Sequence, residues 1–106
     1  HDLAGTLSSL ADDDLRILMD HRPRTAPEAA NPAWKVDPQL SGHTHGGHPG
    51  PVAILASLAN HGFVKGFYGL GGMKLYVSQG AGFWAGFPVR SGTFNEIPLI
   101  TFTRAN

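Results

Sequence analysis

The stretch "SGHTHGGHPG", Ser41 to Gly50, places three histidines and four glycines within ten residues. The whole chain has only six histidines, so half of them lie in this tract. Such a tract can be a metal site, a proton relay or a chance cluster on a loop. The segments around it help to decide among these, because they determine where in the fold the tract lies.

Three short helices are expected from spacing and capping residues. Residues 2–10 carry leucines at helical spacing, and Asp2 suits the N-cap position. Thr25 is expected to cap a second helix that runs through residue 30. The apolar run directly after the histidine tract, residues 51–60, predicts a third helix that ends before a glycine.

Strands are expected between and after these helices. The apolar run at residues 15–20 predicts a buried strand, and residues 39–41 predict a very short one. Residues 63–70 and 73–80 flank a Gly-Gly pair and predict a β-hairpin. The end of the chain, residues 96–104, is expected to form a last strand.

The order of these elements predicts an α/β layered domain with a sheet sandwich on its C-terminal side. The chain has 106 residues, which is enough for one domain with a modest core. Its hydrophobic content is 42% and its charged content is 15%, as in a packed globular protein. No internal repeat and no domain boundary is visible, so residues 1–106 are treated as a single domain.

Composition excludes several classes of site. Eight basic residues balance eight acidic ones and are scattered along the chain, so nucleic acid is not an expected partner. No apolar run approaches the roughly 20 residues of a membrane span. The chain has no cysteine, so any metal ion must be held by nitrogen and oxygen atoms.

The positions of the histidines relative to the predicted strands indicate which of them could bind metal ions together. His43 and His45 are two residues apart, so on an extended segment both project to one side. Such a pair can bind one metal ion or reach two adjacent ions. His21 follows the preceding strand, and ligands gather at strand ends in α/β sheets. If the two strands are neighbours, His21 converges with His43 and His45, whereas His48 is expected to lie on the surface.

The segments "ILMDHRP" and "SGHTHGG" together resemble the C-terminal half of the calcineurin-like metallophosphoesterase superfamily. The later segment "GFYGLGGMKLYVSQGAGFWAGFPVRSGTFNEIPLITF" resembles the membrane-associated or secreted bacterial branch of this superfamily. The resemblance covers residues 16–102. It implies the C-terminal portion of a four-layer α/β/β/α sandwich, and hence a single incomplete domain that carries the GHTH motif. For the parent protein it implies a hydrolase that acts on phosphomonoesters or phosphodiesters.

The resemblance also implies a site for two divalent ions, with manganese, iron or zinc as the expected metals. His21 and His43 would ligate one ion and His45 the other. Other positions would shape the site or face substrate: Gly42, Thr44, Gly46, Gly47, His48 and Arg90.

The superfamily draws its remaining ligands from three motifs, Asp-x-His, Gly-Asp-x-x-Asp and Gly-Asn-His-Asp/Glu, none of which occurs in this chain. No catalytic residue is therefore assigned, and the chain alone is expected to hold at most one ion weakly and to be inactive. Its expected partners are a phosphoester substrate and either the missing N-terminal half or a second copy. The alternative is a binding or assembly module that has kept the fold without the catalytic ligands.

Overall fold

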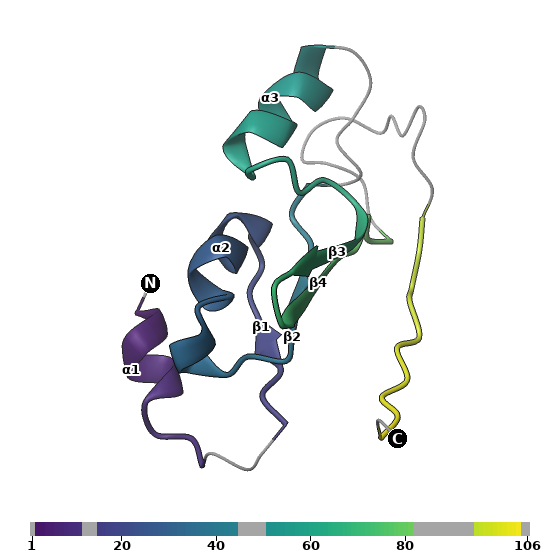
Figure 1. The fold of residues 1–106 in the computed structure, drawn as a ribbon. Helices are drawn as coiled ribbons and strands as arrows, with labels where there is room; N and C mark the ends of the chain where they lie inside the picture. The colour runs from purple at the N-terminus through teal and green to yellow at the C-terminus, as the bar shows by residue number, and fades with distance from the viewer. Residues whose placement is uncertain (1, 12–14, 45–50, 82–94, 105–106) are drawn as a thin grey trace.

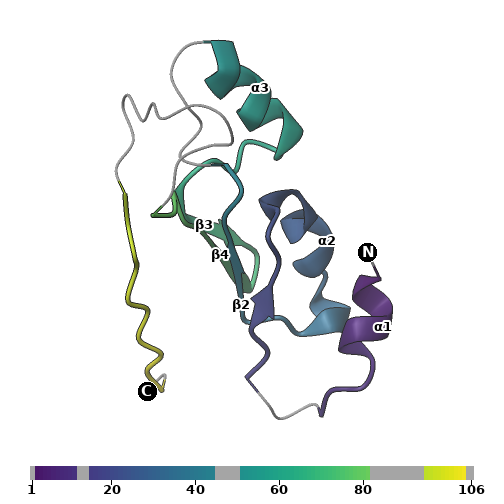
Figure 2. The same ribbon diagram turned by 180° about the vertical axis from the view of Figure 1, so that it is seen from behind.

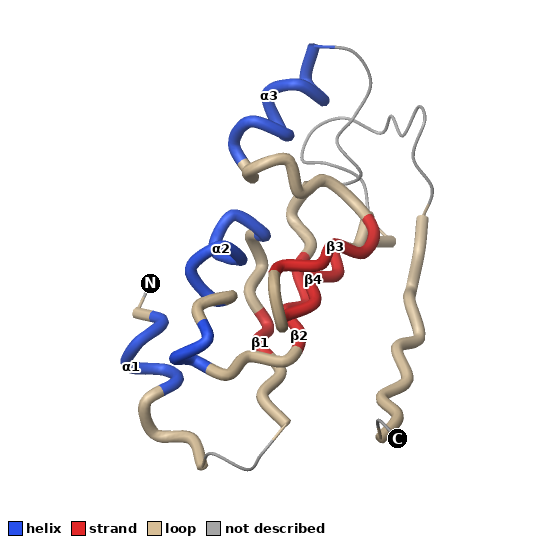
Figure 3. The backbone as a smooth tube through the Cα atoms, in the orientation of Figure 1, coloured by secondary structure: helices blue, strands red, loops and turns tan. Residues whose placement is uncertain are grey.

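The computed structural model describes residues 2–11, 15–44, 51–81 and 95–104. Within these residues, four short strands form one mixed sheet in the order β1-β2-β4-β3. β1 runs parallel to β2, β2 runs parallel to β4, and β3 and β4 pair antiparallel. The strands are β1 (Leu18–Met19), β2 (Pro38–Ser41), β3 (Gly66–Leu70) and β4 (Met73–Val77). The predicted α/β class is confirmed, and Figure 3 shows the strands in red among helices in blue.

In the described part of the chain, three helices accompany the sheet: α1 (Leu3–Leu7), α2 (Ala26–Ala29) and α3 (Pro51–Ala59). Short 3₁₀ turns, Pro23–Thr25 and Pro32–Trp34, flank α2. α1 and α2 lie on one side of the sheet, and α3 lies beyond its end (Figures 1 and 2). Among the described residues, no helix is long and apolar enough to cross a membrane.

The first helix begins as predicted and ends earlier. The Asp2 carboxylate accepts a hydrogen bond of 2.9 Å from the Gly5 amide, which confirms the N-cap. The helix ends at Leu7, earlier than the predicted Leu10, and the Leu10 carbonyl beyond it accepts a hydrogen bond of 3.1 Å from the Arg16 guanidinium.

The hairpin agrees closely with the sequence prediction. β3 and β4 pair from Gly66–Val77 to Leu70–Met73, and the two glycines between them make the turn. Gly71 has a φ of 59°, a backbone conformation that side-chain-bearing residues rarely adopt. The alternation predicted for β4 is also confirmed, since Met73, Leu75 and Val77 are all buried.

The hydrophobic core lies between one face of the sheet and the two helices α1 and α2. Leu75 and Val77 are fully buried at its centre. Leu3 and Leu7 are four residues apart on α1, so both project from one face of the helix into the core. The full set is Leu3, Leu7, Leu18, Ala26, Ala29, Val36, Met73, Leu75 and Val77.

The other face of the sheet carries a row of apolar side chains. The strand register aligns Met19 with Leu40, Leu40 with Tyr76, and Tyr76 with Phe67. We call these four side chains the apolar row. Met19 is 81% exposed and Phe67 is 72% exposed, and the Phe67 and Tyr76 rings lie 4.6 Å apart between centroids. A contiguous apolar surface of this kind is typical of a face that packs against another element.

The prediction of a buried strand at residues 15–20 was wrong in two respects. Only Leu18–Met19 pairs as a strand, and Leu15 and Ile17 are 55% and 41% exposed. The buried positions are Arg16 and Leu18, which alternate with the exposed ones. Because helices cover only one face of the sheet, β1 has one buried side and one exposed side.

The prediction of a last strand at residues 96–104 was also wrong. Residues 95–104 run along the side of the sheet opposite α1 and α2 (Figures 1 and 2). They form no ladder with any described strand. Ile97 and Leu99 are 88% and 93% exposed, and Pro98 has no amide hydrogen to donate. Apolar alternation alone does not make a strand where the described residues offer no pairing partner.

Arg16 is a charged residue buried at the edge of the core, with 6% of its surface exposed. Its guanidinium donates to the carbonyl of Trp34 at 2.7 Å and to those of Leu10 and Ala11, each at 3.1 Å. These bonds join the segment after α1 to the turn before β2. Arginine suits this position because its planar head presents several donors in a fixed geometry.

Replacing Arg16 with methionine is expected to lower the free energy of unfolding by about 2–3 kcal/mol, because three carbonyls lose their donor. Urea unfolding followed by circular dichroism measures the change. Arg16→Lys is the matched control, and it should recover part of the loss, because a single ammonium can donate to some of these carbonyls. Wild-type stability in Arg16→Met would contradict the structural role.

Candidate metal and phosphoester site

Two neighbouring parallel strands deliver His21 and His43 to the same edge of the sheet. β1 ends at Met19 and β2 ends at Ser41, so each histidine lies two residues beyond its strand. Two backbone hydrogen bonds continue the pairing past the strands. The Asp20 amide donates to the Leu40 carbonyl, and the Gly42 amide donates to the His21 carbonyl, both at 3.1 Å. The predicted convergence is confirmed for His21 and His43.

The two imidazoles face each other through their ring nitrogens. Nε2 of His21 lies 3.2 Å from Nδ1 of His43, and the rings are nearly perpendicular, with 75° between their planes and 5.0 Å between centroids. Without an ion, this spacing allows one hydrogen bond whose direction depends on the tautomers. When two nitrogens bind the same tetrahedral ion, each at about 2.0–2.1 Å, they lie about 3.3 Å apart. The spacing therefore fits two ligands of a single metal ion.

The backbone at His43 is turned in an unusual way. His43 has a φ of 68°, in the left-handed region that few residues other than glycine adopt. Such conformations are costly and persist where surrounding contacts hold them, often at functional sites. Thr44 supplies one of these contacts. It is 5% exposed, its hydroxyl donates to the Val64 carbonyl, and its amide donates to the Gly42 carbonyl at 2.8 Å.

Several residues predicted for the site lie outside the described part of the chain. His45, Gly46, Gly47, His48 and Arg90 are in this group. Gly42 and Thr44 are described, and both lie directly beside His43. Within residues 2–11, 15–44, 51–81 and 95–104, no cluster of three or more metal-ligating side chains is found. Of the three histidines predicted as metal ligands, the described part of the chain brings together His21 and His43.

A chain of polar side chains that the sequence did not suggest lies behind the two histidines. Thr25 donates to the Asp20 carboxylate at 2.6 Å, and the Gln39 amide donates to Thr25 at 3.1 Å and to Ser41 at 3.0 Å. Gln39 has no exposed surface. The only sequence signal was Thr25, for which we predicted a capping role; it occupies the N-cap of α2, but its hydroxyl makes no capping bond.

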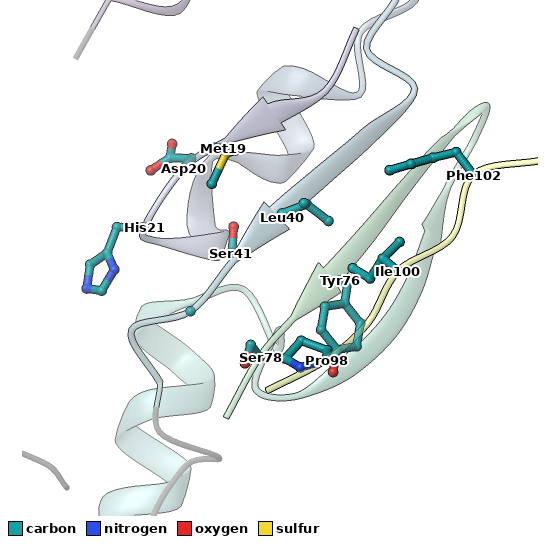
Figure 4. A pocket seen from close by; sticks show the side chains of 11 residues that line it. Met19, Asp20, His21, Leu40, Ser41, Tyr76, Ser78, Pro98, Ile100 and Phe102 are labelled. Atoms are coloured by element: carbon teal, nitrogen blue, oxygen red, sulfur yellow. The ribbon is translucent and has the colours of Figure 1, made fainter. Parts of the chain in front are cut away.

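A cavity of about 600 Å³ begins beside His21 and extends over Met19, Leu40 and Tyr76 of the apolar row. Asp20, His21 and Gly42 line its end near the strand termini. Tyr76, Pro98 and Ile100 line it further along, and Figure 4 shows them apart from His21. The cavity is therefore mostly apolar and polar only at the histidine end.

Glu96 fastens the C-terminal segment to the sheet next to this cavity. One of its carboxylate oxygens accepts from the Gln79 amide at 2.8 Å and from the Tyr76 hydroxyl at 3.0 Å. The Gln79 backbone donor is the main cause that lowers the pKa of Glu96. Burial, together with the bond to Glu96, raises the pKa of Tyr76. Both shifts favour a charged carboxylate that accepts from a neutral phenol near pH 7.

Comparison with known proteins places this site in context. The chain is 46% identical over 84 residues, 78% of its length, to an uncharacterized metallophosphoesterase of Campylobacter jejuni, Cj0846. It is 34% identical over 99% of its length to the uncharacterized metallophosphoesterase YkuE of Bacillus subtilis. It is also 37% identical over 84% of its length to a transmembrane protein with metallophosphoesterase domain of Danio rerio.

These relatives are much longer than the chain. It spans 22% of the Campylobacter protein, 37% of the Bacillus protein and 20% of the Danio protein. No protein-family model matches the chain, and no solved structure matches it. From its identity to these relatives, the 106-residue chain belongs to the calcineurin-like metallophosphoesterases, and it matches the C-terminal part of longer members of that superfamily.

Proposed function

We propose that this chain contributes two or three metal ligands to a metal-dependent phosphoesterase, with phosphomonoesters or phosphodiesters as substrates. The observation that carries the proposal is the 3.2 Å separation between His21 Nε2 and His43 Nδ1, a spacing that suits one divalent ion. The names of the relatives support a phosphoesterase and a dependence on divalent metal.

In this proposal His21 and His43 hold one ion, and His45, which lies outside the described residues, holds a second. Manganese, iron or zinc would suit a site of nitrogen and oxygen ligands. Bound divalent ions stabilise negative charge on phosphoryl oxygens and make water a better nucleophile. The protein's own contribution is to present both imidazoles from neighbouring strand ends.

The charges of a two-metal site explain why the chain alone is proposed to be inactive. Two divalent ions about 4 Å apart repel by about 16 kcal/mol at an effective dielectric constant of about 20. Neutral imidazoles do nothing to offset that repulsion, whereas bridging carboxylates do. The Asp20 carboxylate, the acidic group next to His21, accepts from Thr25 and from the Arg22 amide. The required carboxylates are therefore proposed to come from sequence outside these 106 residues.

The apolar row supports a proposal about the fold as well. We propose that residues 1–106 are one part of a four-layer α/β/β/α sandwich, in which a second sheet covers Met19, Leu40, Tyr76 and Phe67. The relatives contain several times as many residues as this chain, enough to supply such a layer. A second copy of the chain is the other candidate for covering the row. For location we propose membrane association or secretion, and the names of two relatives, both transmembrane proteins, support membrane association.

The activity test compares two proteins against a chromogenic phosphodiester in the presence of Mn²⁺. One is the 106-residue chain, and the other is the chain with all the sequence that its gene encodes. We expect turnover only from the second protein, with loss of turnover on chelation and recovery when Mn²⁺ is returned. Turnover by the 106-residue chain would refute its incompleteness. An inactive, metal-free complete protein would instead indicate the binding or assembly module.

A further inference from the structure

The polar chain of Asp20, Thr25, Gln39 and Ser41 joins the carboxyl ends of β1 and β2 on the helix-covered side of the sheet. Asp20 directly precedes His21, and Ser41 lies two residues before His43. Thr25 stands between them at the start of α2. The hydrogen bonds run without a gap, at 2.6 Å from Thr25 to Asp20, 3.1 Å from Gln39 to Thr25 and 3.0 Å from Gln39 to Ser41.

The direction of these hydrogen bonds is fixed at the Asp20 end. An ionised carboxylate only accepts, so the Thr25 hydroxyl donates its single hydrogen to Asp20. The Arg22 carbonyl is a weaker acceptor for that hydrogen, at 3.3 Å and without charge. The Thr25 oxygen therefore accepts, which requires Gln39 to present its amide nitrogen. Both hydrogens of that nitrogen are used, one for Thr25 and one for Ser41.

Gln39 is a polar side chain in a fully buried position. It has no exposed surface, and its Oε1 has no hydrogen-bond partner among the described residues. A buried acceptor without a partner costs about 1–3 kcal/mol. The same amide group donates two hydrogen bonds, so Gln39 links Thr25 to Ser41 while its carbonyl oxygen has no partner among the described residues.

β1 needs such support because its backbone pairing is short. The strand has two residues, and only the Asp20 and Gly42 amides continue the pairing towards the histidines. Metal–ligand distances in a well-formed site lie within about 0.2 Å of their usual values. A small slip of β1 along β2 would therefore move His21 away from His43 by more than the site allows.

We infer that Thr25 and Gln39 are positioning residues that hold β1 against β2 and so set the spacing between His21 and His43. This inference rests on the proposed function, in which those two histidines bind one ion. Removing either residue's hydrogen bonds lowers metal affinity by more than the accompanying loss of stability explains. Residues that orient metal ligands typically contribute about 10–100-fold to affinity, and for these we expect a loss of about tenfold.

The test titrates Co²⁺ into the protein expressed with all the sequence that its gene encodes, and follows the visible absorption of the bound ion. Thr25→Val removes the hydroxyl while keeping the shape of the side chain, and Thr25→Ser restores the hydroxyl. We expect Thr25→Val to raise the dissociation constant about tenfold and Thr25→Ser to stay within about twofold of wild type. Gln39→Met, which removes both amide hydrogens, should match Thr25→Val.

Asp37→Ala is the matched control at the other end of β2, where the Asp37 carboxylate accepts from the Arg16 amide at 2.9 Å. It should lower the melting temperature and leave Co²⁺ affinity unchanged. Wild-type affinity in Thr25→Val, or an equal loss in Asp37→Ala, would overturn the inference; Gln39→Met decides if Thr25→Val does not fold. Failure of the proposed function looks different, because His43→Ala would then bind Co²⁺ as wild type does.

Discussion

Replacing His43 with alanine is expected to lower metal-dependent phosphodiester turnover by more than about 100-fold in the protein expressed with all the sequence that its gene encodes. Residues that merely orient a metal ligand contribute about 10–100-fold, so loss of a ligand itself should exceed that range. Nδ1 of His43 lies 3.2 Å from Nε2 of His21, and alanine leaves His21 as the one imidazole of this pair. Initial rates over a range of Mn²⁺ concentrations measure the effect.

The matched control is His61→Asn, which removes an exposed imidazole beyond the end of α3. His61 also has a positive φ, of 55°, and asparagine tolerates that conformation better than most residues. Turnover should therefore remain near wild type, and the melting temperature should change little. If His43→Ala retained wild-type turnover, the assignment of the histidine pair as a metal site would be wrong.

The local elements of the fold could be predicted because their signals are local. The Gly71–Gly72 pair between two apolar stretches specifies a hairpin, and Asp2 specifies the start of α1. The short strand at Gln39 to Ser41 also followed from the turn before it. Each of these signals depends on backbone preferences that act within a few residues.

The meeting of His21 and His43 could be predicted from the order of elements, because strands joined through a helix tend to be parallel neighbours. The polar chain behind them could not. Thr25 was expected to cap α2, but its hydroxyl instead donates to the Asp20 carboxylate and accepts from the Gln39 amide. Such a choice depends on which side chains meet in space, and a single sequence does not show that.

For a related reason, the sequence could not show that residues 96–104 do not form a strand in the described structure. Their apolar alternation is the pattern of a strand, yet a strand exists only where another strand accepts its hydrogen bonds. The described part of the chain offers no such partner, and Glu96 alone ties the segment to β4. The described helices cover one face of the sheet, so β1, expected to be buried, exposes Met19 on the other face.

Replacing Leu40 with aspartate tests whether a second layer of structure covers the apolar row. Leu40 is half-buried at the middle of the row, paired with Met19 on one side and Tyr76 on the other, and it lines the cavity. If a second layer covers the row, the new carboxylate is buried without a partner. We then expect the free energy of unfolding to fall by about 3 kcal/mol or more.

Ser9→Asp adds the same charge at an exposed position after α1 and should change stability by less than about 0.5 kcal/mol. Urea unfolding of both variants, in the protein with all the sequence that its gene encodes, gives the comparison. Its dependence on protein concentration identifies what covers the row. Cover from within the same polypeptide gives a loss that is independent of concentration, whereas cover from a second copy gives a wild-type stability that rises with concentration. A change in Leu40→Asp as small as that in Ser9→Asp would mean that the row faces solvent, and the four-layer sandwich would then be wrong.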